Sequence, residues 1–212
     1  MPRSFPFPAH AVNVPQLRAA AKAWAKENKD LSVRDAEAIL TALVRDKASM
    51  KKYMAGILLG YLPEQRKTLD PGLHDKWLDH LAGWAAVDSL CYANFSAPEI
   101  LVNFTSWETL IKRLVKSENE NKRRAALVLL TKPLMQSTDN RLRQLAFYCI
   151  GKTKHEKDIL ITKAISWLMR SMVKHHKKEL EKFIFENKAN LPAVALRETG
   201  NKLRTGRKSG KE

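Results

Sequence analysis

Apolar residues recur along most of the chain at intervals of three and four, the spacing that places side chains on one face of an α-helix. The alternation typical of β-strands is almost absent. Ser32, followed by Asp35, forms an S-x-x-D pattern that marks a helix start. The pattern predicts successive amphipathic helices over residues 15–27, 32–46, 48–61, 70–82, 84–94, 97–116 (with a break inside it left open), 120–131, 138–151, 157–173, 176–187 and 192–203.

The short connections between these segments favour antiparallel neighbours, and a long run of such helix pairs is how α-solenoids bury their apolar faces. The signatures of tetratricopeptide and ankyrin repeats are absent, which leaves the degenerate HEAT class. We therefore predict an all-α fold, a right-handed α-solenoid of antiparallel HEAT-like helix pairs. A Pro-rich leader (1–14) precedes a single repeat domain (15–203), and a frayed basic C-terminal tail (204–212) follows it.

Charge narrows the class of partner. The chain has 38 Lys and Arg against 22 Asp and Glu, a formal net charge of +16, so its field attracts polyanions. Nucleic acid is the first candidate, although ribosomal and membrane-surface proteins can be equally basic. Cys91 and Cys149 have no CxxC spacing, which argues against a disulfide framework or a thiolate zinc site and fits a reducing cytoplasm.

Localisation follows from two further features. Prolines interrupt the N-terminal residues before an apolar segment can form, which argues against a secretory signal. Charges interrupt every apolar run, so no membrane span is predicted. We expect a cytoplasmic protein, nucleoid-associated if the source is bacterial, with no membrane partner and no obligate protein partner, and a monomer.

Two stripes can be drawn on the helix predicted over 157–173. The core-facing stripe consists of Ile161, Ile165, Leu168 and Met172. The second stripe, displaced by about 200° around the helix, consists of Lys163, Trp167, Arg170 and Lys174. Trp167 is therefore predicted to point away from the core among cations, as a surface for sugar, base or phosphate contact would require. The alternative is that its indole packs on the next repeat or under Lys stems.

A second cationic group follows at a helix junction. It runs Lys174-His175-His176-Lys177-Lys178 and could receive phosphates, although a solvated charge run is the alternative reading. Neighbouring histidines on a helix point in different directions, and the remaining histidines show no ligand spacing, so no metal site is predicted.

A carboxylate lies near a tryptophan earlier in the chain. Trp84 and Asp88 are four residues apart, so both side chains share one helix face, on which we also place Leu81 and Cys91. A carboxylate among apolar residues costs free energy unless it is paired or functional. Asp88 either caps the following turn or pairs with an Arg, or it stabilises positive charge that develops beside an aromatic wall.

Four blocks in order resemble the AlkD-type DNA alkylation-repair glycosylases, and the resemblance covers roughly residues 35–203. They are Trp84-Ala-Ala-Val-Asp88-Ser89, Arg123-Arg124-Ala-Ala-Leu, Lys163-Ala-Ile-Ser-Trp167-Leu-Met-Arg170 and Leu191-Pro192-Ala-Val-Ala-Leu-Arg197-Glu198. Lys52-Tyr53-Met54 resembles the N-terminal block of the family only in part, so the N-terminus is divergent or shortened.

The resemblance implies a HEAT-like solenoid that cradles duplex DNA and hydrolyses the N-glycosidic bond of purines alkylated at N3 or N7. It implies Asp88 as the catalytic carboxylate, Trp84 and Trp167 as the residues that contact lesion and sugar, and Arg124 as a DNA contact. We add further backbone-contacting residues from the cationic stripe, the cationic group and the second block: Arg123, Lys163, Arg170, Lys174 and Lys177. No metal or organic cofactor is expected.

Two other functions stay open at this point. The first is a non-catalytic module of the same fold that binds damaged or branched DNA, with Asp88 structural. The second is a protein-interaction solenoid, for which DNA affinity would depend little on salt.

Overall fold

The computed structural model describes residues 4–6, 13–92 and 94–210, and every regular element among them is an α-helix. This confirms the all-α prediction. The chain divides into two compact units, Met1–Asn94 and Phe95–Glu212. The single domain predicted over 15–203, its HEAT-like pairing and its right-handed winding stay predictions. Most of the Pro-rich leader lies outside the described residues.

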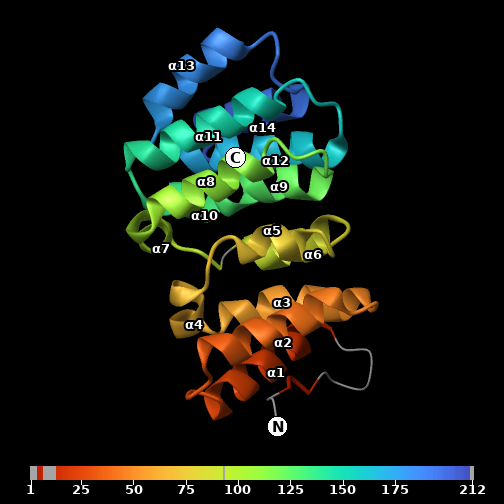
Figure 1. Cartoon of the computed structure of the whole chain (residues 1–212). Coiled ribbons are helices and arrows are strands. Elements are labelled where there is room, and N and C mark those ends of the chain that lie inside the picture. The colour runs from red at the N-terminus through yellow and green to blue at the C-terminus, as the bar shows by residue number, and fades with distance from the viewer. Residues whose placement is uncertain (1–3, 7–12, 93, 211–212) are drawn as a thin grey trace. The chain divides into compact units, whose positions relative to one another are not determined.

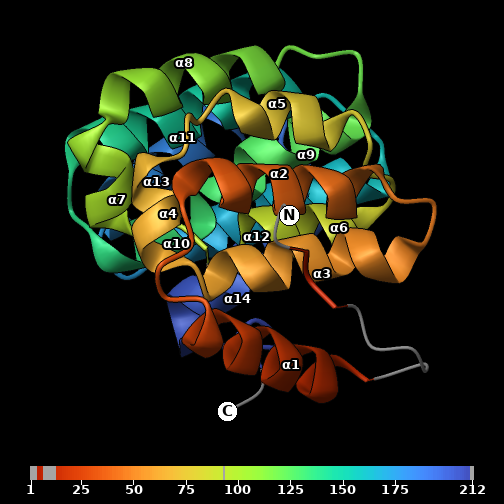
Figure 2. The ribbon, with the colours of Figure 1, turned by 60° about the horizontal axis from the view of Figure 1, so that its bottom comes forward.

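The first unit contains six helices among its described residues (Figure 1). They are α1 (Val14–Glu27), α2 (Val33–Arg45), α3 (Ser49–Gly60), α4 (Pro63–Thr68), α5 (Leu73–Leu78) and α6 (Trp84–Cys91). Helix α3 is central, because it packs against α1, α2 and α6, and Figure 2 shows the same neighbours from another side. Its segment from Met54 to Leu59 is buried on all sides, as expected of a helix enclosed by others.

Side-chain caps mark the starts of α1 and α2 in this unit. The hydroxyl oxygen of Ser32 accepts a hydrogen bond from the backbone N–H of Asp35 at 3.1 Å, as predicted from the S-x-x-D pattern. Asn13 and Gln16 form a reciprocal capping box at the start of α1. One prediction was wrong here, since residues 70–82 contain only the short helix α5, and α4 was missed.

The second unit contains α7 (Ala97–Val102), α8 (Phe104–Leu114), α9 (Glu120–Leu129), α10 (Thr131–Gln136), α11 (Asn140–Thr153), α12 (Ile159–Met172), α13 (Lys177–Asn187) and α14 (Ala193–Thr205). Helix α12 is its centre and packs against α9, α10 and α14 (Figure 1). The range 97–116 is indeed broken, between α7 and α8, and the short α10 was not predicted.

The C-terminal residues turn back onto α14 instead of leaving it as a frayed tail. Helix α14 continues to Thr205 and ends at Gly206, which has a positive φ of 74°. Lys208, which follows Gly206, contacts α14 twice. Its carbonyl accepts a hydrogen bond from the Asn201 side chain at 3.1 Å, and its ammonium lies 3.2 Å from the Glu198 carboxylate. Residues 211–212 lie outside the described part of the chain.

Candidate functional site

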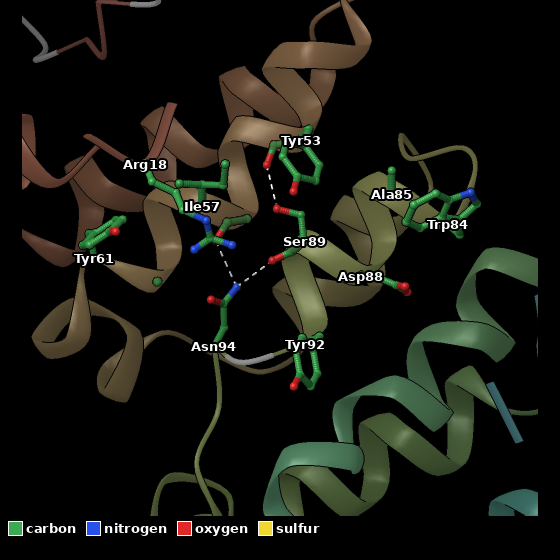
Figure 3. Close-up of a pocket in the computed structure, with 12 residues that line it drawn as sticks. Arg18, Tyr53, Ile57, Tyr61, Trp84, Ala85, Asp88, Ser89, Tyr92 and Asn94 are labelled. Carbon is green, nitrogen blue, oxygen red and sulfur yellow. Dashed lines mark hydrogen bonds between the residues drawn. The ribbon is translucent and has the colours of Figure 1, made fainter. Parts of the chain in front are cut away.

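Trp84 and Asp88 stand on the same side of α6 (Figure 3). The helix starts directly after Gly83, whose φ of 78° lies in the left-handed region that glycine adopts without strain. Trp84 is therefore the first residue of the helix, and 59% of its surface is exposed. Asp88, one turn later, is half-buried. The predicted i, i+4 pairing of these two side chains is confirmed.

The surroundings of Asp88 differ from the apolar face that we predicted. Leu81 is buried but lies before the helix starts, so the helical spacing does not apply to it. Cys91 is buried at the C-terminal end of α6, away from the exposed first turn. The apolar side of α6, with Val87 and Leu90, is fully buried, and Asp88 is on the more open side. The carboxylate is thus not placed in a purely apolar environment.

The position of α6 is fixed by close backbone contact with α3. A methyl group added at Gly56 would lie 2.2 Å from the carbonyl carbon of Ser89, so only glycine permits this approach. The Ser89 hydroxyl donates to the carbonyl of Tyr53 at 2.8 Å. The buried Asn94 amide donates to the carbonyls of Gly56, at 3.0 Å, and Leu90, at 2.8 Å. These contacts hold the Asp88-bearing helix against α3.

The two site residues line a pocket of about 390 Å³ in the first unit. Its lining is Arg18, Tyr53, Gly56, Ile57, Gly60, Tyr61, Trp84, Ala85, Asp88, Ser89, Tyr92 and Asn94. In Figure 3, Trp84 and Asp88 lie on one side of Ser89, while Arg18 and Tyr61 lie on the other. The pocket thus combines a carboxylate and aromatic walls with a guanidinium, a set suited to a cationic group attached to a phosphate.

Sequence reasoning did not nominate several of these residues. Tyr92 follows Asp88 by four, so extending the Trp84–Asp88 spacing by one turn would have found it. Tyr53 belongs to the Lys52-Tyr53-Met54 segment, which carried a partial signal. Arg18 and Tyr61 come from other helices, and no local pattern connects them to Asp88.

The two stripes predicted on α12 are confirmed in their orientation. Ile161, Ile165, Leu168 and Met172 are completely buried. On the other stripe, Lys163 and Lys174 are exposed, and Trp167 and Arg170 are half-buried. Trp167 therefore stands at the edge of the buried face, beside cations, and its contact with a lesion stays a prediction.

Arg170 is engaged within the second unit. Its guanidinium pairs with the Glu198 carboxylate of α14 and donates to the Ser166 hydroxyl at 2.5 Å. Burial lowers the pKa of Arg170, opposed by the charge of Glu198. Burial also pushes the pKa of Glu198 upward, but hydrogen bonds from Ser166 and Lys208 and the charge of Arg170 outweigh it and hold that pKa below its usual value. The positive charge of Arg170 is thus neutralised by the Glu198 carboxylate.

The two arginines of α9 have structural partners. Arg123 donates to both carboxylate oxygens of Glu156 at 2.8–3.1 Å and to the carbonyls of Ser117 and Glu118. Arg124 is only 6% exposed and donates to the carbonyl of Leu160 at 2.6 Å, which ties α9 to α12. Both residues therefore stabilise the unit, and their phosphate contacts stay a prediction.

The cationic group at 174–178 divides into two kinds of residue. Lys174 and Lys177 are exposed, as phosphate contacts require. His175 and His176 each place Nε2 3.0 Å from a backbone carbonyl, of Met135 and Ser137 respectively, so these rings hold the helix junction in place. Among the described residues, no cluster of three or more His, Cys, Asp or Glu side chains could hold a metal ion.

The candidate residues are divided between the two units. Trp84 and Asp88 belong to Met1–Asn94, while Trp167 and the predicted backbone-contacting cations belong to Phe95–Glu212. Their convergence on one surface stays a prediction.

The sequence matches the model of the family described as "DNA alkylation repair enzyme" over residues 1–203. The chain belongs to the DNA alkylation repair enzyme family. The match begins at residue 1, further toward the N-terminus than the resemblance from about residue 35 that the motifs gave, so it also includes α1, the helix that carries Arg18.

A solved structure supports the same fold. The predicted DNA alkylation repair enzyme from Enterococcus faecalis is similar to this chain with a TM-score of 0.73 and 20% identity, over 92% of this chain and 87% of that one. At this identity the likeness shows the fold of the family and not a shared activity. A comparison with curated proteins finds no match. None of the described helices is long and apolar enough to cross a membrane.

Proposed function

We propose that this member of the DNA alkylation repair family is a DNA glycosylase that hydrolyses the N-glycosidic bond of purines alkylated at N3 or N7 in duplex DNA, on a HEAT-like solenoid. The observation that carries the proposal is the pair of Trp84 and Asp88 on the open side of α6, lining one pocket with Arg18 and Tyr53. An indole that is 59% exposed is free of the core and available to a ligand.

The chemistry follows from the charge of the substrate. A purine alkylated at N3 or N7 is already cationic, so when the C1′–N bond breaks, its electron pair stays on the base, which leaves neutral. Positive charge then develops on the deoxyribose. The Asp88 carboxylate stabilises that charge, as carboxylates do in glycoside hydrolysis. A water oxygen bonds to C1′ and releases a proton to Asp88 or to solvent, which yields the free base and an abasic site.

The remaining residues bind and orient the substrate. The face of the Trp84 ring attracts the cationic base and sugar, and Trp167 supplies a second such face. The exposed Lys163, Lys174 and Lys177 contact phosphates and contribute affinity without reading sequence. Arg123, Arg124 and Arg170 hold the helices of the second unit together, and Arg123 and Arg170 do so in ion pairs with Glu156 and Glu198. Their contribution to binding is to keep these helices in place.

A gel-based excision assay on a duplex that contains 7-methylguanine tests the proposal. We expect the wild-type protein to release the base well above the spontaneous rate, and Asp88→Asn to be slower by about 10²–10³-fold because the transition state loses its carboxylate. Glu27→Gln, an exposed acid-to-amide change at the end of α1, is the matched control and should excise normally.

The same assay distinguishes the alternative. If wild-type protein binds the damaged duplex but never exceeds the spontaneous rate, the chain is a non-catalytic binding module of this family and the glycosylase proposal is wrong.

A further inference from the structure

Helix α1 carries a row of cations on the side opposite its buried face. Arg18, Lys22 and Lys26 follow one another at intervals of four, and all are exposed. At about 100° per residue they occupy a sector of about 80°, centred about 130° from the buried Leu17–Ala21–Trp24 stripe. Lys29, also exposed, continues the row in the turn after the helix. We call these four residues the α1 ridge.

No carboxylate of α1 interrupts the ridge. The one acid of this helix is Glu27, which follows Lys26 and therefore points about 100° away from it around the axis. Lys22, Lys26 and Lys29 line a surface hollow whose lining includes one acid, Glu64 of α4, and the Glu64 carboxylate lies 3.0 Å from the Lys67 ammonium. Asp30 directly follows Lys29 in the turn, so the continuous positive potential is that of Arg18, Lys22 and Lys26 on the helix itself.

The ridge is continuous with the Asp88 pocket. Arg18 lines that pocket, and Lys22, Lys26 and Lys29 line a second hollow of about 450 Å³. Tyr61 lines both, so the two hollows adjoin at this residue, and Figure 3 shows Tyr61 and Arg18 on the same side of Ser89. All of these residues belong to the first unit, so their arrangement does not depend on the second.

We propose that the α1 ridge is a track for the phosphates of one strand of duplex DNA, which leads away from the nucleotide held at Asp88. The eight steps from Arg18 to Lys26 rise about 12 Å along the helix, which equals the axial length of about three to four nucleotides of one strand. The proposal rests on the proposed function for the nature of the polymer.

A membrane surface would be the other polyanion for a basic helix. Amphipathic helices that lie on membranes insert an apolar face between the headgroups. The apolar face of α1 is already used, since Leu17 and Ala21 are completely buried and Trp24 is 8% exposed. The observations therefore favour a nucleic acid backbone.

The test measures the affinity of the full-length protein for an undamaged fluorescent duplex at several salt concentrations. Each phosphate contact contributes about 0.9 to the slope of log K against log salt, so Lys22→Gln/Lys26→Gln/Lys29→Gln should reduce the slope by about 2.7. The matched control is Lys157→Gln/Lys182→Gln/Lys188→Gln, which removes three exposed charges of the second unit that lie near Glu156, Glu181 and Glu186 in the sequence. It should change the slope by less than about one contact, about 0.9.

Equal changes in both triple variants would overturn the proposal, because net charge alone would then explain binding. Loss of binding to phosphatidylserine vesicles, with unchanged binding to duplex, would overturn it too. If the triple variant does not fold, Lys26→Gln alone should reduce the slope by about 0.9. Because undamaged DNA is used, the outcome is separate from excision, and a protein that binds along the ridge but releases no base would contradict only the proposed function.

Discussion

Gly56→Ala should lower both the free energy of unfolding and the rate of excision, because α3 and α6 are in backbone contact at this glycine. The added methyl would lie 2.2 Å from the Ser89 carbonyl carbon, whereas ordinary contact begins at 3.4 Å, so the two helices must separate by about 1.2 Å, the difference between these distances. The obstacle is backbone, which cannot rotate away. Overpacking of this kind costs about 1–3 kcal/mol of unfolding free energy.

The same displacement moves Asp88, which directly precedes Ser89 on α6. A misplacement of about 1 Å costs about 10²-fold in rate when catalysis depends on orientation. Urea denaturation measures the first effect, and single-turnover excision of 7-methylguanine at a temperature where the variant is folded measures the second. DNA affinity should fall much less than the rate, because the phosphate contacts lie elsewhere.

Gly151→Ala is the control for this experiment. Gly151 also lies inside a helix, α11, but a methyl group there would meet nothing within 4 Å. Alanine should therefore stabilise the protein by up to about 1 kcal/mol and leave excision unchanged. If Gly56→Ala also keeps wild-type stability and rate, the close packing of α3 and α6 does not position the carboxylate, and this reasoning is refuted.

Two further predictions concern stability and the exposed indole. His74 is completely buried, which lowers its pKa to about 4. Since the unfolded chain takes up a proton at about pH 6.5 and the folded protein does not until about pH 4, stability should be lost as the pH falls through this window, by about 2.5 kcal/mol at pH 4.5. Urea unfolding at pH 7.5 and 4.5 measures this, and an equal pH dependence in His74→Gln would contradict it. Trp84→Ala should change the unfolding free energy by less than about 1 kcal/mol but reduce excision, whereas Trp77→Ala, which empties a site that is 1% exposed, should cost about 3–5 kcal/mol. A large loss of stability in Trp84→Ala would show that the indole belongs to the core.

Longer helices could be predicted because each carries several turns of apolar periodicity. The ranges 15–27 and 32–46 differ from α1 and α2 by at most one residue at each end. The six-residue helices α4 and α10 were missed because they are too short to show a period, and α10 contains Pro133, which reads as an interruption.

In the candidate site too, contacts within one helix could be predicted from the sequence, whereas contacts between helices could not. The i, i+4 spacing was enough to place Trp84 and Asp88 on one side of a helix, since both lie within two turns. Arg18 is 70 positions from Asp88 in the sequence, and only the packing of α1 and α6 on α3 brings it into the pocket. The pairing of Arg170 with Glu198 likewise depends on the contact between α12 and α14, which no local pattern reveals.

The role of Asp88 is tested most directly by single-turnover release of free 7-methylguanine from a defined duplex, with the protein in excess, for wild type and Asp88→Asn. Our account predicts equal affinity for the duplex and a rate that is about 10²–10³-fold lower in the variant. Equal rates in the two proteins would show that the carboxylate takes no part in breaking the bond.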